Sequence, residues 1–254
     1  MRRFCVLLAS AFAAVGLCAV ALAAGRAAAT SSCTIAPTKA WTVCPRADLA
    51  GRKLARADLR NANLAGANLT GATLTRANLA TADLTRATLA GARLDNANLA
   101  FANLSGSVLN RANLSGANLA SANLSGARLS RADLVGAILS GASITGTNLA
   151  HANLTRANLA GANLAGANLS GANLEGANLV GANLSRANLT GARLTNATLS
   201  GAYLLGAKLN SANLTGATLL GADLTRANLA GAKLGNVGWF DTICPDGKKT
   251  RRGC

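Results

Sequence analysis

The chain has 254 residues and a formal net charge of +16; half of its residues are apolar, but only 3% are aromatic. The apolar residues are too many and too regularly placed for a disordered chain. They are almost all Ala and Leu, so any core must be uniform and built of small side chains, and the length allows one or two ordinary domains.

Residues 1–29 are predicted to form a secretory signal peptide. Arg2 and Arg3 make a short basic segment, residues 4–24 are apolar, and two small-residue cleavage sites follow, the later at Ala29. An uncleaved membrane anchor is the alternative, because the apolar run is long enough to span a bilayer. Removing this segment leaves 22 basic and 9 acidic residues, a net charge of +13. We therefore expect a secreted or cell-envelope protein.

A five-residue unit then repeats without interruption. Every fifth residue from Leu49 to Leu234 is Leu, with Ile144 as the one exception, which makes 38 consecutive units. Ala stands two residues before this central position in 35 of the 38 units, and the exceptions are Arg52, Ser107 and Thr147. Asn or Asp usually lies between the Ala and the Leu, and the last two positions vary. Such regularity indicates one architecture throughout the array.

A period of five fits neither a single helix nor a single strand. On a helix the leucines would spiral around the axis, and on a long strand they would alternate between the two faces. Within one unit, however, Ala and Leu point to the same side of a short strand, and the variable pair, which often contains Gly, can turn the chain. Four such corners close a square coil of twenty residues. Stacking at ~4.8 Å per strand would give a rod of roughly 45 Å.

The unit resembles that of the pentapeptide repeat family, A-[DN]-L-x-x, as in A-N-L-A-G at 162–166 and A-N-L-S-G at 167–171. The resemblance covers residues 47–236. It implies an all-β fold, a right-handed quadrilateral β-helix with four pentapeptides per coil and about nine and a half coils, and the handedness comes from the resemblance alone. The flanks, W-T-V-C-P at 41–45 and W-F-D-T-I-C-P-D-G at 239–247, look like the ends of exported bacterial members.

Two caps are predicted, an N-terminal cap over 30–46 and a C-terminal cap with a basic tail over 237–254. A stacked solenoid needs them because its ends expose apolar residues and unpaired strand edges. Trp41, Trp239 and Phe240 are interpreted as lids on the Ala/Leu core.

Four cysteines remain outside the signal peptide, and they flank the array: Cys33, Cys44, Cys244 and Cys254. If the array is rigid, only the pairs Cys33–Cys44 and Cys244–Cys254 are within reach. An oxidising compartment would keep these two disulfides closed. Metal binding is the weaker alternative, because no histidine lies near the cysteines.

The sequence carries no recognisable catalytic arrangement, so we expect a non-enzyme without a cofactor or a metal. His151 is the single histidine and falls at a corner position, where a solvated surface residue is expected. The nine acidic residues are scattered and suggest no carboxylate pair, and no nucleotide-binding or metalloprotease motif occurs. Charge is the remaining signal.

The charges are unevenly distributed over the four sides of the predicted coil. Side zero contains the unit centred on Leu49 and every fourth unit after it; sides one, two and three begin in the same way at Leu54, Leu59 and Leu64. Their net charges are +3, +5, 0 and +1. Sides zero and one form the predicted basic face, for which the candidate residues are Lys53, Arg56, Arg76, Arg93, Arg111, Arg128, Arg131, Arg156, Arg193, Lys208 and Lys233.

We therefore expect a non-catalytic exported solenoid, a structural or interaction module at the bacterial cell surface. It would bind anionic polymers, or another protein, weakly and in a salt-sensitive manner through its basic face. The alternative is a cytosolic basic solenoid that acts on nucleic acid or modulates a DNA topoisomerase such as gyrase. Members of the family that resemble duplex DNA are acidic and cytosolic, and this chain is basic. Capped ends favour a monomer.

Overall fold

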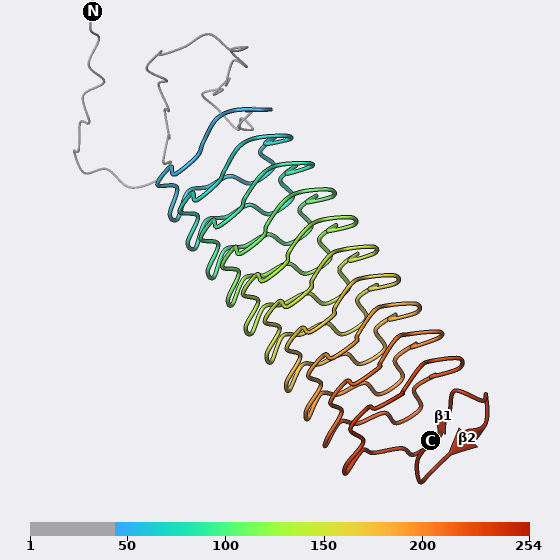
Figure 1. Cartoon of the computed structure of the whole chain (residues 1–254). Helices are drawn as coiled ribbons and strands as arrows, with labels where there is room; N and C mark the ends of the chain where they lie inside the picture. Colours follow the sequence, from blue (N-terminus) through green and yellow to red (C-terminus); the bar gives the residue numbers. More distant parts are fainter. Residues whose placement is uncertain (1–43) are drawn as a thin grey trace, which may run out of the picture.

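The computed structural model describes residues 44–254. The predicted signal peptide, Trp41, Cys33 and the predicted Cys33–Cys44 disulfide lie wholly or partly outside the described residues, so these assignments stay predictions. Figure 1 shows the described chain as a straight stack of similar coils that runs from its blue end near residue 44 to its red C-terminal end.

Each unit contributes one short bridging strand, and the strands stack in parallel. An unbroken series of bridges pairs each second position with the residue twenty positions later, from Asp48 with Asn68 to Asp223 with Ile243. In a typical unit the Leu164 N–H donates to the Asn183 carbonyl at 2.7 Å. One coil therefore takes four units, and the β-helix expected from the sequence is present.

The core of the rod consists of the first and third positions of the units. Ala162 and Leu164 are fully buried, and the same holds for most of the equivalent residues along the chain. Two of the exceptions at the first position keep their hydroxyl groups satisfied inside this apolar core. Ser107 donates to the Leu104 carbonyl at 2.6 Å, and Thr147 donates to the Leu124 carbonyl at 2.7 Å. Polar groups are tolerated in the core because each is hydrogen-bonded.

The fourth and fifth positions turn the chain. The Leu164 carbonyl accepts the Ala167 N–H at 3.0 Å, and Gly166, at the fifth position between them, has a φ of 66°. A positive φ at the third residue of a turn is the feature of a type II turn and favours Gly. Many corners are nevertheless not Gly. Nine of them are arginines with a positive φ: Arg46, Arg56, Arg76, Arg86, Arg111, Arg131, Arg156, Arg186 and Arg226.

The Asn or Asp at the second position has a structural role that the sequence interpretation missed. Its side-chain oxygen accepts the backbone N–H two residues later, as in the bond of 3.2 Å from Ala165 to Asn163. Several of these amides also donate along the rod to the Asn of the preceding coil, as Asn118 does to Asn98 at 3.2 Å. The side chain therefore stabilises the turn that follows it.

A short hairpin ends the rod. Strand β1 (Thr242–Ile243) pairs antiparallel with β2 (Lys249–Thr250), and Ile243 continues the ladder of the preceding coil through Asp223. Trp239 is 8% exposed and packs on the core, as expected of a lid. Phe240 is 54% exposed instead, because its ring lies on the surface with the Arg251 guanidinium 5.0 Å from the ring centre.

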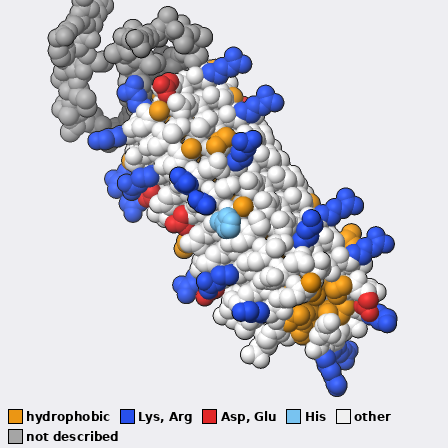
Figure 2. All heavy atoms as spheres, viewed as in Figure 1, with side chains coloured by type: hydrophobic (Ala, Val, Ile, Leu, Met, Phe, Trp, Pro, Cys, Tyr) orange, Lys and Arg blue, Asp and Glu red, His pale blue; other side chains and the backbone are white. Residues whose placement is uncertain are grey.

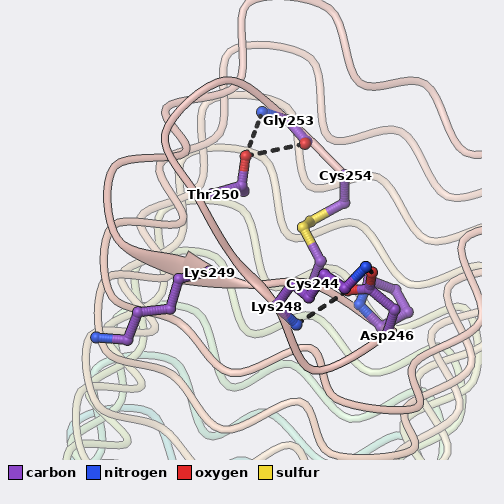
Figure 3. Close-up of a pocket in the computed structure, with 8 residues that line it drawn as sticks. Cys244, Asp246, Lys248, Lys249, Thr250, Gly253 and Cys254 are labelled. Atoms are coloured by element: carbon purple, nitrogen blue, oxygen red, sulfur yellow. Dashed lines mark hydrogen bonds and ion pairs between the residues drawn. A yellow bond between two sulfur atoms is a disulfide. The ribbon is translucent and has the colours of Figure 1, made fainter.

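The predicted Cys244–Cys254 disulfide closes this hairpin segment, with a Cα–Cα distance of 5.4 Å (Figure 3). No helix long and apolar enough to cross a membrane occurs in the part of the chain that the structure describes.

Candidate anion-binding surface

All eleven candidate residues of the basic face are exposed. Six occupy second positions of their units, in the middle of a side, and five are corner arginines at fifth positions with a positive φ. The twenty-residue register distributes them over two neighbouring sides along the length of the rod, so the coil brings them to one broad surface. Figure 2 shows blue Lys and Arg side chains spread along the visible face.

Most of these cations have no acidic partner. Arg193 lies 2.9 Å from Glu175, and Arg93 lies 3.7 Å from Asp95. The Arg193–Glu175 pair is exposed and therefore contributes little to stability, whereas Asp95 in the other pair is half-buried. Among the described residues 44–254, the other nine form no ion pair: Lys53, Arg56, Arg76, Arg111, Arg128, Arg131, Arg156, Lys208 and Lys233. Their charge is available to an external anion.

One corner row brings three basic side chains together in successive coils. Arg111, Arg131 and His151 occupy the same corner, each twenty residues after the last, so they follow one another at ~4.8 Å along the rod. His151 extends over Gly171, where a Cβ atom would lie 2.6 Å from the imidazole Nδ1. The acidic residue that lies nearest to this row in the sequence is Asp133, two residues after Arg131. Its carboxylate accepts the Val135 N–H at 3.2 Å and forms no ion pair with the row. The sequence predicts His151 as a solvated surface residue at a corner, and this prediction missed the row.

The charges of side two neutralise each other. Arg60 donates to the Asp58 carboxylate through Nε at 2.9 Å and through Nη2 at 2.7 Å. This side-chain hydrogen bonding lowers the pKa of Asp58 below its ordinary value. Side two thus offers no free positive charge, in contrast with sides zero and one.

The hollow beside the C-terminal hairpin has no catalytic arrangement. It is open, has a volume of about 420 Å³ and is lined by Cys244, Asp246, Lys248 and neighbouring residues (Figure 3). Lys248 lies 3.8 Å from Asp246, and both side chains are well exposed. Over residues 44–254 no group of three His, Cys, Asp or Glu side chains could hold a metal ion. The basic face is therefore the best candidate for a binding surface.

Comparison with protein families gives a match over almost the whole array. The family model for pentapeptide repeats matches this chain in eight copies, in segments that run from 46–80 to 202–237. A search of curated proteins found no match.

Several solved structures are similar to this chain. HetL from the cyanobacterium Nostoc sp. strain PCC 7120, described as involved in regulating heterocyst differentiation, is 38% identical; the match covers 81% of this chain and 88% of HetL, with a TM-score of 0.35. QnrB1, a plasmid-mediated fluoroquinolone resistance protein, is 22% identical over 75% of this chain and 87% of its own, with a TM-score of 0.45. A protein of the Arabidopsis thaliana thylakoid lumen is 32% identical over 41% of this chain and 65% of its own, with a TM-score of 0.26.

Proposed function

This chain belongs to the pentapeptide repeat family. We propose that it is a non-catalytic solenoid that is exported to the bacterial cell surface, and the predicted signal peptide at 1–29 is what supports export. Its coil would be right-handed and four-sided, with about nine and a half coils along 47–236. The proteins it resembles carry different functions in their descriptions, so family membership supports the repeat architecture, and the partner has to be argued from this chain's own surface.

The observation that carries the proposal is the uneven charge of the rod. Sides zero and one together hold a net charge of +8, whereas sides two and three together hold +1. Nine of the eleven cations of the basic face have no ion pair within the described part of the chain. Charges spread along the length of a rod suit an extended anionic polymer, such as an acidic cell-wall polymer, more than a small ligand.

The corner arginines add a second argument. A residue other than Gly with a positive φ carries a cost of roughly 1 kcal/mol or more, and Arg is not among the residues enriched there. Arg111, Arg131 and Arg156 nevertheless occupy such corners on sides zero and one. Folding alone would favour Gly or Asn at these positions. Arg86, Arg186 and Arg226 on side three meet the same cost, so the corner arginines support a use for the charged surface of the rod but do not by themselves single out sides zero and one.

Replacing Arg111, Arg131 and Arg156 together with Asn is expected to weaken binding to an immobilised anionic polysaccharide. Asn already occupies equivalent corners at Asn96 and Asn196, so the fold should tolerate it. Each lost contact with an anionic group reduces the magnitude of the slope of log affinity against log salt by about 1. The slope of the triple variant should therefore be smaller in magnitude by about 2 to 3. The elution salt from a heparin column, measured at several pH-matched salt gradients, gives this slope.

The matched control is the triple replacement of Arg86, Arg186 and Arg226 with Asn. These are also corner arginines with a positive φ, and removing them changes the net charge by the same amount, but they lie at the corner where side three meets side zero, at the edge of the basic face, whereas Arg111 and Arg131 lie at the corner between sides zero and one. The proposal requires the control to elute later than the side zero and side one variant. Equal elution of the two variants would mean that only net charge matters and that no basic face exists.

The alternative, a cytosolic solenoid that acts on nucleic acid or a topoisomerase, would use the same cations. Neither side zero nor side one contains an aromatic residue. Base stacking on such residues is what lets proteins hold single strands. This absence from the sequence of the two sides argues against single-stranded nucleic acid as the partner of the basic face.

A further inference from the structure

A long stretch of side two carries no charge. Its eight successive units from 77–81 to 217–221 contain no Lys, Arg, Asp, Glu or His. Charged residues appear on this side only beyond this stretch, as the mutually paired Asp58 and Arg60 at one end and Asp241 at the other. This uncharged stretch contrasts with the net charge of +8 on sides zero and one.

The same side carries most of the large apolar side chains that the described chain exposes. Five of the seven lie there, namely Phe101 (65% exposed), Ile138 (41%), Val180 (42%), Leu220 (39%) and Phe240 (54%). The first four belong to every second coil, so they recur at intervals of about 10 Å. The units of the intervening coils present only Asn, Ala, Ser, Thr and Gly to the outside. Large and small units thus alternate along side two.

The polar groups of side two are already bonded within the side. Asn98 donates to Asn78 at 3.2 Å, Asn118 donates to Asn98 at 3.2 Å, and Asn178 donates to Asn158 at 3.2 Å. The oxygens of these amides also accept backbone N–H groups, as from Val180 to Asn178 at 3.1 Å. Removing water from such a surface costs less than removing it from unpaired amides.

We propose that side two is a lateral dimer interface for a second copy of this chain. The two rods would lie antiparallel around a two-fold axis that passes between two coils, such as those of Ile138 and Asn158, so that the large apolar units of each copy face the small units of the other. An isologous interface needs a self-complementary surface, which the alternation supplies. Charge selects the same side, because two copies repel each other through sides zero and one and meet no such repulsion through side two.

The size of side two sets the strength of this contact. Eight coils at ~4.8 Å and a width of roughly 10 Å give about 400 Å² per copy, near half the ~800 Å² of a standard interface. The dimer is therefore weak and depends on protein concentration, with a dissociation constant in the micromolar range or above. The expectation of a monomer from capped ends concerned contacts between rod ends, and this contact is lateral.

Sedimentation equilibrium of the protein expressed from its full chain tests the proposal, with Val180→Asp as the variant and Val135→Asp as its matched control. Both valines occupy the fourth position of a unit, but Val135 lies on side one. Asp95 and Glu175 show that a carboxylate is tolerated at this position of the coil. The V180D replacement would bury an unpaired charge between the copies and should weaken self-association at least about tenfold.

The expected result is a reversible monomer–dimer equilibrium for the wild type and V135D that is lost in V180D. A wild type that stays monomeric up to about millimolar concentration, at which weak contacts of this size associate, would overturn the proposal. If V180D and V135D self-associated to the same extent, whether both formed dimers or both stayed monomeric, the proposal would be overturned as well. A different occupant of side two, such as another protein, would leave the purified wild type monomeric.

Spin labels test the antiparallel arrangement. A spin label on Ala160→Cys lies near the two-fold axis. The labels of the two copies are then one coil apart along the rod and on faces that pack ~10 Å apart, so they should lie within about 20 Å of each other. A label on Ala100→Cys should be five to seven coils from its counterpart, which is about 24 to 34 Å along the rod. Short distances at both positions would mean parallel rods and contradict the arrangement.

Discussion

Replacing Leu169 with Asp in the middle of the array is expected to destabilise the protein by about 5 kcal/mol or more. The Leu169 side chain is fully buried between Leu149 and Leu189, which occupy the same position in the coils before and after it. An Asp in this place loses the apolar packing of the leucine and has no polar partner in the core. Because repeats contact mainly their neighbours, unfolding should begin at this coil and spread to both sides. Far-UV circular dichroism during denaturant unfolding measures the loss.

Asn168→Asp is the control for this variant, one residue away on the outward-facing second position. The Asn168 oxygen accepts the Ser170 N–H at 3.1 Å, and a carboxylate can accept the same bond, as Asp48 does from Ala50 at 3.3 Å. Asp loses only the long bond of 3.4 Å that the Asn168 amide donates to Asn148. We expect a change within about 1 kcal/mol. If both variants lost stability equally, the assignment of Leu inside and Asn outside would be wrong.

Replacing Gly136 with Val should cost about 2 kcal/mol because of backbone strain alone. Gly136 is a corner residue with a φ of 63°, and a Cβ atom placed on it would have no neighbour within 4 Å. The Cβ atom itself therefore meets no steric clash, and the expected cost is assigned to the backbone. A β-branched side chain is strongly disfavoured at positive φ, whereas Asn is tolerated there.

The companion variant is Gly136→Asn, for which a cost below about 1 kcal/mol is expected. Asn96 and Asn196 occupy the same corner in other coils, with φ values of 55° and 57°. Thermal unfolding of the two variants separates strain from packing. A Val variant as stable as the Asn variant would show that the corner relaxes out of the left-handed region.

The repeated unit made the fold predictable. Ala and Leu two residues apart, followed by a variable pair as in Ala162 to Gly166, fix which side chains are inside and where the chain turns. The structure then shows what this pattern leaves open. The bond from the Asn163 oxygen to the Ala165 N–H depends on a side-chain rotamer, which sequence spacing does not report.

The candidate surface was predictable only in part. The twenty-residue coil predicted from the sequence assigns each charged residue to one of four sides, and this is how the exposed cations of the basic face were predicted. The row of Arg111, Arg131 and His151 was missed because charges were counted by side and corners were not followed from coil to coil. The prediction of Phe240 as a lid is wrong, because Phe240 is exposed, whereas its neighbour Trp239 is buried. Both are large aromatic residues, and the path of the last coil decides which of them faces the core.

Export is the central claim, because the partners proposed for the basic face and the stability of the cysteine pairs depend on it. Fractionation of the native host, followed by sequencing of the protein's N-terminus, tests it directly. We predict a new N-terminus near Ala24 or Thr30 in the medium or the envelope fraction. An intact Met1 in the cytosolic fraction would contradict the account, and nucleic acid and its enzymes would then become the first partners to examine.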